Sequence, residues 1–185
     1  MTGVQTCALP ILLPLSLSIA TSTLVAQSIG ADEPTLAKEI GWSSLIFTTS
    51  ICVIVGLLVW QFKYPLLDLY APPDEVRSAA IPLFLFIAFY QVFDALQVTS
   101  AFILRGYRVA FWPMWIYAIS LWGVGLGGGY VLGFNLTGNI PELLHGAQGF
   151  WFANSMSLAI AAALLMTLFK RTARRFEKEH PPVEV

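Results

Sequence analysis

The sequence of 185 residues is poor in charge, because only 11% of its residues are Asp, Glu, Lys or Arg. Soluble globular domains carry about 25%, so this chain cannot cover a water-exposed surface. The hydrophobic content of 57% also excludes an intrinsically disordered chain. The formal net charge of −1 gives no overall basic field, and we expect no nucleic-acid partner. The class that remains is an integral membrane protein, whose main partner is the lipid bilayer.

Residues that carry out covalent or metal chemistry are also scarce. The chain has two histidines and two cysteines, Cys7 and Cys52, whose spacing supports neither a disulfide framework nor a metal cluster. The sequence offers no set of Ser, His and Asp typical of nucleophilic catalysis. We therefore expect no enzyme and no cofactor.

Five long stretches contain almost no charged residue, and each is long enough to cross about 30 Å of hydrocarbon as a helix. Lipid offers no partner to the backbone, so helices are favoured over any other structure for runs of this length. The sequence predicts an all-α polytopic membrane protein. The expected spans are at about 8–29, 40–62, 80–104, 110–134 and 147–169.

Lysine and arginine are divided unequally between the two sides that five alternating spans create. One side contains only Lys63 and Arg77. The other side holds Lys38, Arg105, Arg108, Lys170, Arg171, Arg174, Arg175 and Lys178. This excess predicts that the tail at 170–185 is cytoplasmic. We interpret its basic run as a topology anchor that can contact anionic lipid.

Small residues predict where helices pack together. Gly125 and Gly129 form a G-x-x-x-G face typical of close helix packing, and Trp122 is expected to pack within the bundle. Gly30 is predicted to end the first span. A stripe in that span is interpreted as helix packing, with the lining of a cavity as the alternative. Its members are Ser16, Ala20, Thr23 and Gln27.

Asp94 is the most informative residue, because it is the only acid in the interior of any predicted span. A charged Asp at the centre of a membrane helix costs about 2.5–3.5 kcal/mol, and such residues usually serve ion pathways or proton relays. Tyr90, Gln91 and Gln97 are predicted to share its face at i−4, i−3 and i+3. This patch could bind Na⁺ through oxygens or hold a titrating carboxyl group. The alternative is an Asp that only joins helices by hydrogen bonds.

Residues 1–10 differ in character from the rest of the chain. They resemble a translated sequencing-adapter read-through, so we interpret this segment as non-native and expect the genuine sequence to begin near Ile11.

Several motifs together resemble a known family. The run Tyr-Gln-Val-Phe-Asp-Ala-Leu-Gln-Val at 90–98, followed by Leu-Arg-Gly-Tyr at 104–107, resembles the tenth helix of NorM-type transporters of the MATE (multidrug and toxic compound extrusion) family. Residues 14–31 are similar to the eighth helix and its exit. Residues 129–133 are similar to the end of the eleventh, and 146–151 to the entry of the twelfth.

The resemblance implies that residues 11–169 form helices eight to twelve of a twelve-helix transporter, which belong to its C-terminal lobe. The N-terminal lobe would lie outside this chain as a partner. Asp94 matches the acid that this family uses to bind the coupling cation, Na⁺ or H⁺. The implied location is the bacterial inner membrane.

The function implied by the resemblance is secondary active multidrug efflux. A cation gradient would drive the export of cationic or amphiphilic small molecules by alternating access. Two alternatives remain open. A related flippase for lipid-linked sugars would favour a basic lumen, although no predicted span contains a basic residue. The chain could also be a standalone five-helix structural subunit.

Overall fold

The computed structural model describes residues 2–136, 138, 141 and 144–180, and their side chains from residue 12 onward except at 70 and 79. Within these ranges the ordered elements are all helices. They are α1 (Thr2–Gly30), α2 (Pro34–Gln61), α3 (Lys63–Tyr70), α4 (Asp74–Ala80), α5 (Leu83–Gly106), α6 (Phe111–Tyr117), the π-helix η1 (Ala118–Gly127), α7 (Gly128–Gly133) and α8 (Ala147–Glu179).

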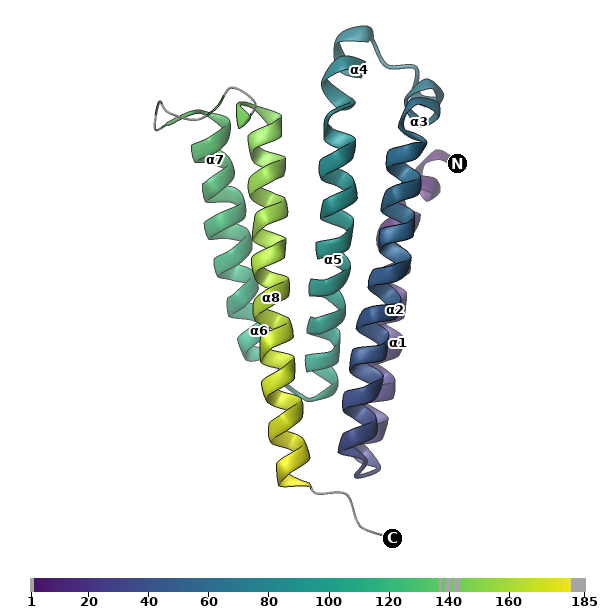
Figure 1. Ribbon diagram of the computed structural model, residues 1–185, viewed down its shortest axis with the longest axis vertical. Helices are drawn as coiled ribbons and strands as arrows, with labels where there is room; N and C mark the ends of the chain where they lie inside the picture. Colours follow the sequence, from purple (N-terminus) through teal and green to yellow (C-terminus); the bar gives the residue numbers. More distant parts are fainter. Residues whose placement is uncertain (1, 137, 139–140, 142–143, 181–185) are drawn as a thin grey trace.

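The helices run up and down as a bundle with α5 at its centre. Helix α5 contacts α1, α2 and α8, and η1 packs on α8. Figure 1 shows α1 and α2 on one side of α5, with α8 and the α6–α7 segment on the other. Among the described residues, five helices are long and apolar enough to cross a membrane, so the predicted all-α fold with five such helices is confirmed. They are Leu12–Gly30, Pro34–Gln61, Leu83–Gly106, Phe111–Gly133 and Ala147–Glu179.

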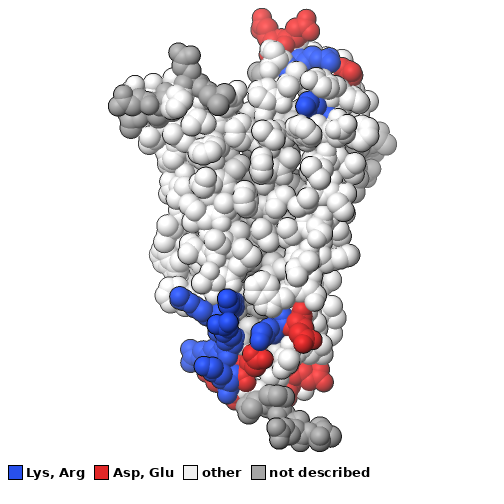
Figure 2. Space-filling view, viewed as in Figure 1, with Lys and Arg blue, Asp and Glu red and all other residues white. Residues whose placement is uncertain are grey.

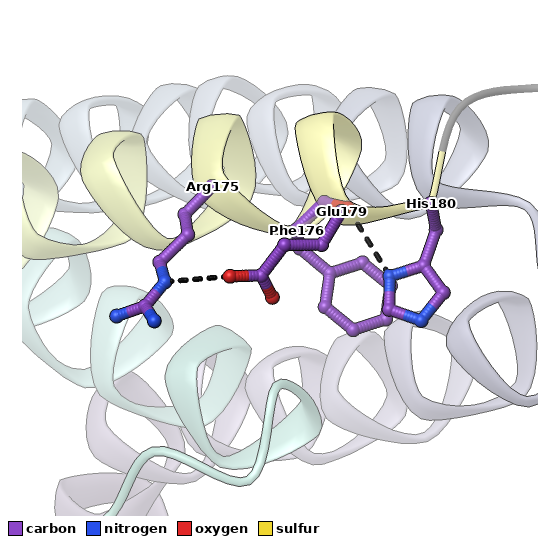
Figure 3. Close-up of polar contacts among 4 residues, drawn as sticks. All are labelled: Arg175, Phe176, Glu179 and His180. Atoms are coloured by element: carbon purple, nitrogen blue, oxygen red, sulfur yellow. Dashed lines mark hydrogen bonds and ion pairs between the residues drawn. The ribbon is translucent and has the colours of Figure 1, made fainter.

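Helix α8 continues well beyond the predicted end at residue 169. The basic run of the expected tail therefore forms the last turns of α8. Arg175 Nε donates to Glu179 Oε1 at 2.8 Å, and the His180 ring stacks on Phe176, with ring centroids 4.4 Å apart. Figure 3 shows these four residues at the end of α8. Ion pairs at i,i+4 support an exposed helix. At the other end of the chain, residues 2–10 lie in the first turns of α1, but their side chains are outside the described part.

Positive charge gathers at one end of the bundle (Figure 2). The α1–α2 connection, the α5–α6 connection and the end of α8 meet there (Figure 1). These segments and the helical turns next to them contain the eight Lys and Arg residues predicted to share a side. Lys63 and Arg77 belong to α3 and α4 at the opposite end, where Arg77 Nη1 pairs with Asp68 Oδ1 at 2.7 Å. The expected segregation of basic residues is therefore present in the fold.

An ion pair and a buried phenol join the helices at the basic end. Lys38 Nζ donates to Glu177 Oε2 at 2.9 Å and links α2 to α8. Tyr107, just after α5, packs its ring on Phe169 and Phe176 of α8. Burial, with a further contribution from the charge of Glu177, raises the pKa of Tyr107 to about 12. The phenol is therefore neutral at physiological pH and acts as a packing group.

Glycine allows close contact at two helix crossings in the core. A Cβ on Gly41 of α2 would lie 2.6 Å from Phe169 Cζ of α8, and one on Gly106 of α5 would lie 2.8 Å from Val25 Cγ1 of α1. The predicted G-x-x-x-G face is confirmed in the same way. Gly125 faces Ser157 and Gly129 faces Phe150, so both pack against α8.

The polar stripe predicted on the first span does not pack against the other described helices of this chain. All four of its residues are exposed: Ser16, Ala20, Thr23 and Gln27. The α1 face that packs on α5 is displaced by two residues, and there Ser18 Oγ and Thr99 Oγ1 share a buried hydrogen bond of 3.0 Å. Composition was similar on the two faces, since both carry small hydroxyl residues, so composition could not choose between them.

One local expectation is confirmed only in part, and another needs correction. Helix α1 ends at Gly30 as predicted, but the left-handed residue that follows it is Asp32, with φ of 61°. The amide of Glu33 donates to Ser28 O and that of Asp32 to Ile29 O, which is the Schellman arrangement. Trp122 is 74% exposed and does not pack within the bundle. It lies in η1, whose i→i+5 hydrogen bonds change the angular spacing of side chains from that of an α-helix.

Candidate functional site

Asp94 is the only acidic residue of α5, the central helix of the bundle. Its carboxylate is half-buried and interacts electrostatically with Tyr90 of the same helix and with Tyr117 of α6. A carboxylate at this depth retains its charge only where protein groups or a bound cation replace water. The surroundings of Asp94 therefore decide what it can do.

Gln97 lies one turn beyond Asp94 and supports its carboxylate. Gln97 Nε2 donates to Asp94 Oδ1 at 3.0 Å, and the Tyr117 hydroxyl donates to the Gln97 backbone oxygen at 3.3 Å. Gln97 is only 6% exposed. Within the described part of the chain, its side-chain Oε1 has no hydrogen-bond partner. The amide that holds the Asp94 carboxylate therefore also carries a buried oxygen without a partner among the described residues, and hard cations bind carboxylate and amide oxygens.

Tyr90 connects Asp94 to α8. Its ring packs edge-to-face on Trp151, with centroids 5.8 Å apart, and its hydroxyl lies within hydrogen-bonding reach of the Asn154 side chain. A T-shaped pair of this kind is a stabilising aromatic arrangement. The sequence prediction that Tyr90 accompanies Asp94 therefore has a structural counterpart, extended by two residues of α8.

Gln91 occupies the other flank of Asp94. Gln91 Nε2 donates to Cys52 Sγ of α2 at 3.9 Å, and Gln91 is 7% exposed. With about 100° per residue in a helix, Tyr90 and Gln97 lie about 40° and 60° to one side of Asp94. Gln91 lies about 60° to the other side by the same spacing. The structure brings Gln97 and Tyr90 to the carboxylate and directs Gln91 to α2.

A groove of about 410 Å³ opens between η1 and α8 beside this cluster. Its lining residues are Leu121, Trp122, Gly125, Leu126, Phe150, Trp151 and Asn154. Trp151 is shared between the groove and Tyr90, so the groove is joined to Asp94 through one aromatic contact. Apolar walls with one or two polar groups are typical of small-molecule sites of about 300–1,000 Å³.

Sequence reasoning missed the groove. Asn154 was a usable signal, because an uncharged amide inside a predicted membrane span is uncommon and favours a specific contact. Trp151 lies near the start of its span, which suggested only an interfacial anchor. No residue pattern reveals that the two face α5.

The donor set around Asp94 differs from a transition-metal site. Among the residues that the structure describes, no three His, Cys, Asp or Glu side chains come together. A cation at Asp94 would instead rely on one carboxylate and neutral oxygens, such as Gln97 Oε1. These ligands are typical of Na⁺, or of a proton held by the carboxyl group alone.

The comparisons with a family model, with relatives and with solved structures agree with one another. A family model described as MatE matches residues 2–131. A probable multidrug resistance protein NorM of Aromatoleum aromaticum is 37% identical over 168 residues, which cover 91% of this chain and 36% of the relative. A protein of the same name in Neisseria meningitidis serogroup B is 31% identical over 181 residues, covering 98% and 38%. The multidrug resistance protein PmpM of Pseudomonas aeruginosa is 31% identical over 173 residues, covering 94% and 36%.

The fold also matches a solved structure. The crystal structure of the eukaryotic MATE transporter AtDTX14 superposes with a TM-score of 0.74 at 21% identity, covering 90% of this chain and 37% of that one. This likeness concerns the fold. The chain spans a little over a third of the length of the relatives that it matches.

Proposed function

Since the chain belongs to the MATE family, with NorM-type relatives, we propose that it takes part in secondary active multidrug efflux. It would do so together with the part of its relatives that this chain does not span, which includes the expected N-terminal lobe. The observation that carries the proposal is the half-buried Asp94 with its Gln97 partner in the central helix.

The coupling step proposed for this chain is cation binding at Asp94. Gln97 holds one carboxylate oxygen through its amide nitrogen, and its own buried oxygen has no partner among the described residues. Na⁺ would bind to both residues, whereas a proton would bind to the carboxylate alone. Either ion neutralises a charge that is costly at this depth. The bound and empty states therefore differ in free energy, as a coupling site requires.

The transported molecules would be cationic or amphiphilic. The groove between η1 and α8 offers the rings of Trp122, Phe150 and Trp151, and aromatic faces attract cations. A groove with few polar groups discriminates weakly, which suits a range of substrates. Loss of the coupling cation would change the charge at Asp94. Through Tyr90, it would also change the position of Trp151 in the wall of the groove. Alternating access then follows from the different affinities of the two states.

The proposed location is the bacterial inner membrane. The end of the bundle that holds the eight basic residues would face the cytoplasm, since Lys and Arg are enriched in cytoplasmic loops. The C-terminal turns of α8 lie at that end (Figure 1).

The test is Asp94→Asn in a transport-competent protein. In a chimera, this chain replaces the matched part of the NorM relative from Aromatoleum aromaticum, and efflux of a fluorescent cationic dye is measured in vesicles with an imposed Na⁺ or H⁺ gradient. We expect efflux to fall to background in D94N, because an amide neither carries the charge nor exchanges the proton. The control is Glu39→Gln, which also replaces a carboxylate by an amide but at an exposed position of α2, and it should leave efflux unchanged. Undiminished efflux by D94N would refute the coupling role.

A further inference from the structure

A second groove lies at the basic end of the bundle, away from Asp94. It has a volume of about 310 Å³ and is formed by Val109 in the α5–α6 connection, by the start of α6 and by the last turns of α8. Its lining residues are Val109, Trp112, Leu168, Arg171, Thr172 and Arg175. We propose that this groove binds the headgroup of an anionic phospholipid, with Arg171 and Arg175 holding the phosphate.

The groove has an apolar half and a basic half, arranged along the helix axis. Leu168 belongs to the uncharged stretch of α8, whereas Arg171 and Arg175 lie one and two turns further toward the charged end. Trp112 is 60% exposed at the start of the apolar span Phe111–Gly133. Tryptophan is enriched at the level of lipid headgroups. The boundary between hydrocarbon and headgroups therefore falls within this groove.

The two arginines are placed to act together on one anion. They are four residues apart on α8, which puts them on the same face, and both are exposed. Arg175 uses its Nε to bind Glu179, which leaves its terminal nitrogens for another partner. Arg171 takes part in none of the ion pairs of the described residues. The planar guanidinium group matches phosphate oxygens in a bidentate manner.

The backbone of the α5–α6 connection fixes the other wall. Arg108 is left-handed, with φ of 59°, while its amide donates to Arg105 O at 2.9 Å and the Val109 amide to Leu104 O at 2.8 Å. This Schellman motif places Val109 in the groove. Arg108, the residue before it, is a further exposed cation. The Arg105 guanidinium lies over the Phe102 ring, 4.6 Å from its centroid.

A lipid fits these features better than a soluble phosphate. A free anion would use only the basic half and would leave Trp112, Leu168 and Val109 exposed. A phospholipid places its phosphate against the arginines and its glycerol and first methylenes against the apolar wall. The volume is at the lower end of small-molecule sites, about 300–1,000 Å³, which suits a headgroup with its acyl chains outside. Basic pockets between membrane helices on the cytoplasmic side are known to bind anionic headgroups.

The experiment is native mass spectrometry of the full 185-residue chain in detergent, titrated with phosphatidylglycerol or with phosphatidylcholine of the same acyl chains. We expect phosphatidylglycerol to bind preferentially. The double variant R171Q/R175Q should lower its binding constant about tenfold or more, because each basic residue near a lipid surface contributes appreciably. The matched control is K170Q/R174Q, which removes the same charge from exposed residues of α8 outside the groove. It should keep at least half of the wild-type binding constant.

Three outcomes would overturn the proposal. Equal binding of the two lipids would show that no anionic headgroup is selected. Equal losses in the two double variants would show a diffuse response to net charge. Displacement of phosphatidylglycerol by millimolar inorganic phosphate or glycerol phosphate would show that the arginines take a free phosphate. Circular dichroism of each variant should match the wild type, as expected for substitutions at exposed positions.

Discussion

Replacing Gly41 by alanine tests the close crossing of α2 and α8. The new Cβ would lie 2.6 Å from Cζ and 3.2 Å from Cε2 of Phe169, whereas ordinary contact begins at 3.4 Å. The Phe169 ring is fully buried and packs against Trp42 and Tyr107, with centroids 5.3 and 6.1 Å away. Because both neighbours confine the ring, it cannot move aside without disturbing them.

Two effects of opposite sign determine the free energy of unfolding of the Gly41→Ala variant. Alanine is favoured over glycine in a helix interior by about 1 kcal/mol. Overpacking of a well-packed core costs about 1–3 kcal/mol, and the confined ring places Gly41 in the upper part of that range. We therefore expect a net loss of about 1–2 kcal/mol. Gly123→Ala is the control, because a Cβ there meets nothing within 4 Å, and it should lose no stability.

The assay is unfolding in mixed micelles with increasing SDS, followed by far-UV circular dichroism. A second change, Phe169→Leu, removes the ring atoms that the new methyl group would meet. In that background Gly41→Ala should cost at least about 1 kcal/mol less than in the wild type, as a double-mutant cycle measures. If Gly41→Ala stabilises the chain as much as the control does, or if its cost is unchanged in the Phe169→Leu background, the inferred crossing is wrong.

Two further predictions concern single contacts. Ser18→Ala and Thr99→Val, separately and together, should give a coupling free energy of about 0.6 kcal/mol, the average for hydrogen bonds between membrane helices. In the same SDS assay, a coupling near zero would contradict the 3.0 Å bond between α1 and α5. Arg108→Gly should stabilise the chain by about 1 kcal/mol, because glycine adopts the left-handed conformation at φ of 59° without the steric cost of a Cβ. Arg105→Gly, in the last turn of α5, is the comparison variant. If Arg108→Gly instead destabilises the chain, the Arg108 side chain contributes more stability than its left-handed backbone costs.

The number and type of the helices could be predicted because one physical requirement governs each span. A segment in lipid must satisfy the hydrogen bonds of its own backbone, which a helix does, and it must carry few charges. Long uncharged stretches such as 40–62 and 110–134 meet both conditions. The end of α8 was harder to predict, because charge ends the apolar span and does not end the helix. The ion pair of Arg175 with Glu179 lies on helical turns beyond the apolar stretch.

Helix ends depend on backbone register, which composition reports poorly. The left-handed residues after α1, α5 and α7 are Asp32, Arg108 and Asn135. Each is followed by a residue whose amide donates to a carbonyl five positions back: Glu33 to Ser28, Val109 to Leu104 and Leu136 to Val131. None of the three left-handed residues is glycine, so a search for a glycine stop placed the left-handed residue after α1 at Gly30, two positions before Asp32.

One part of the surroundings of Asp94 could be predicted from the sequence, and the other part could not. Its partners on α5 follow from helical spacing, because residues three and four positions apart share a side, and the spacing also separates Gln91 from Tyr90 by about 100° and from Gln97 by about 120°. The α8 side of the cluster, with Trp151 and Asn154, depends on how α8 is rotated against α5. That rotation is set by contacts such as Gly125 on Ser157 and Gly129 on Phe150, between segments distant in the sequence. The cation-binding half of the site is thus local to one helix, whereas the groove exists only when η1 and α8 pack against each other. Substitutions at Gly125 or Gly129 should therefore alter the groove and leave the hydrogen bond of Gln97 to Asp94 in place.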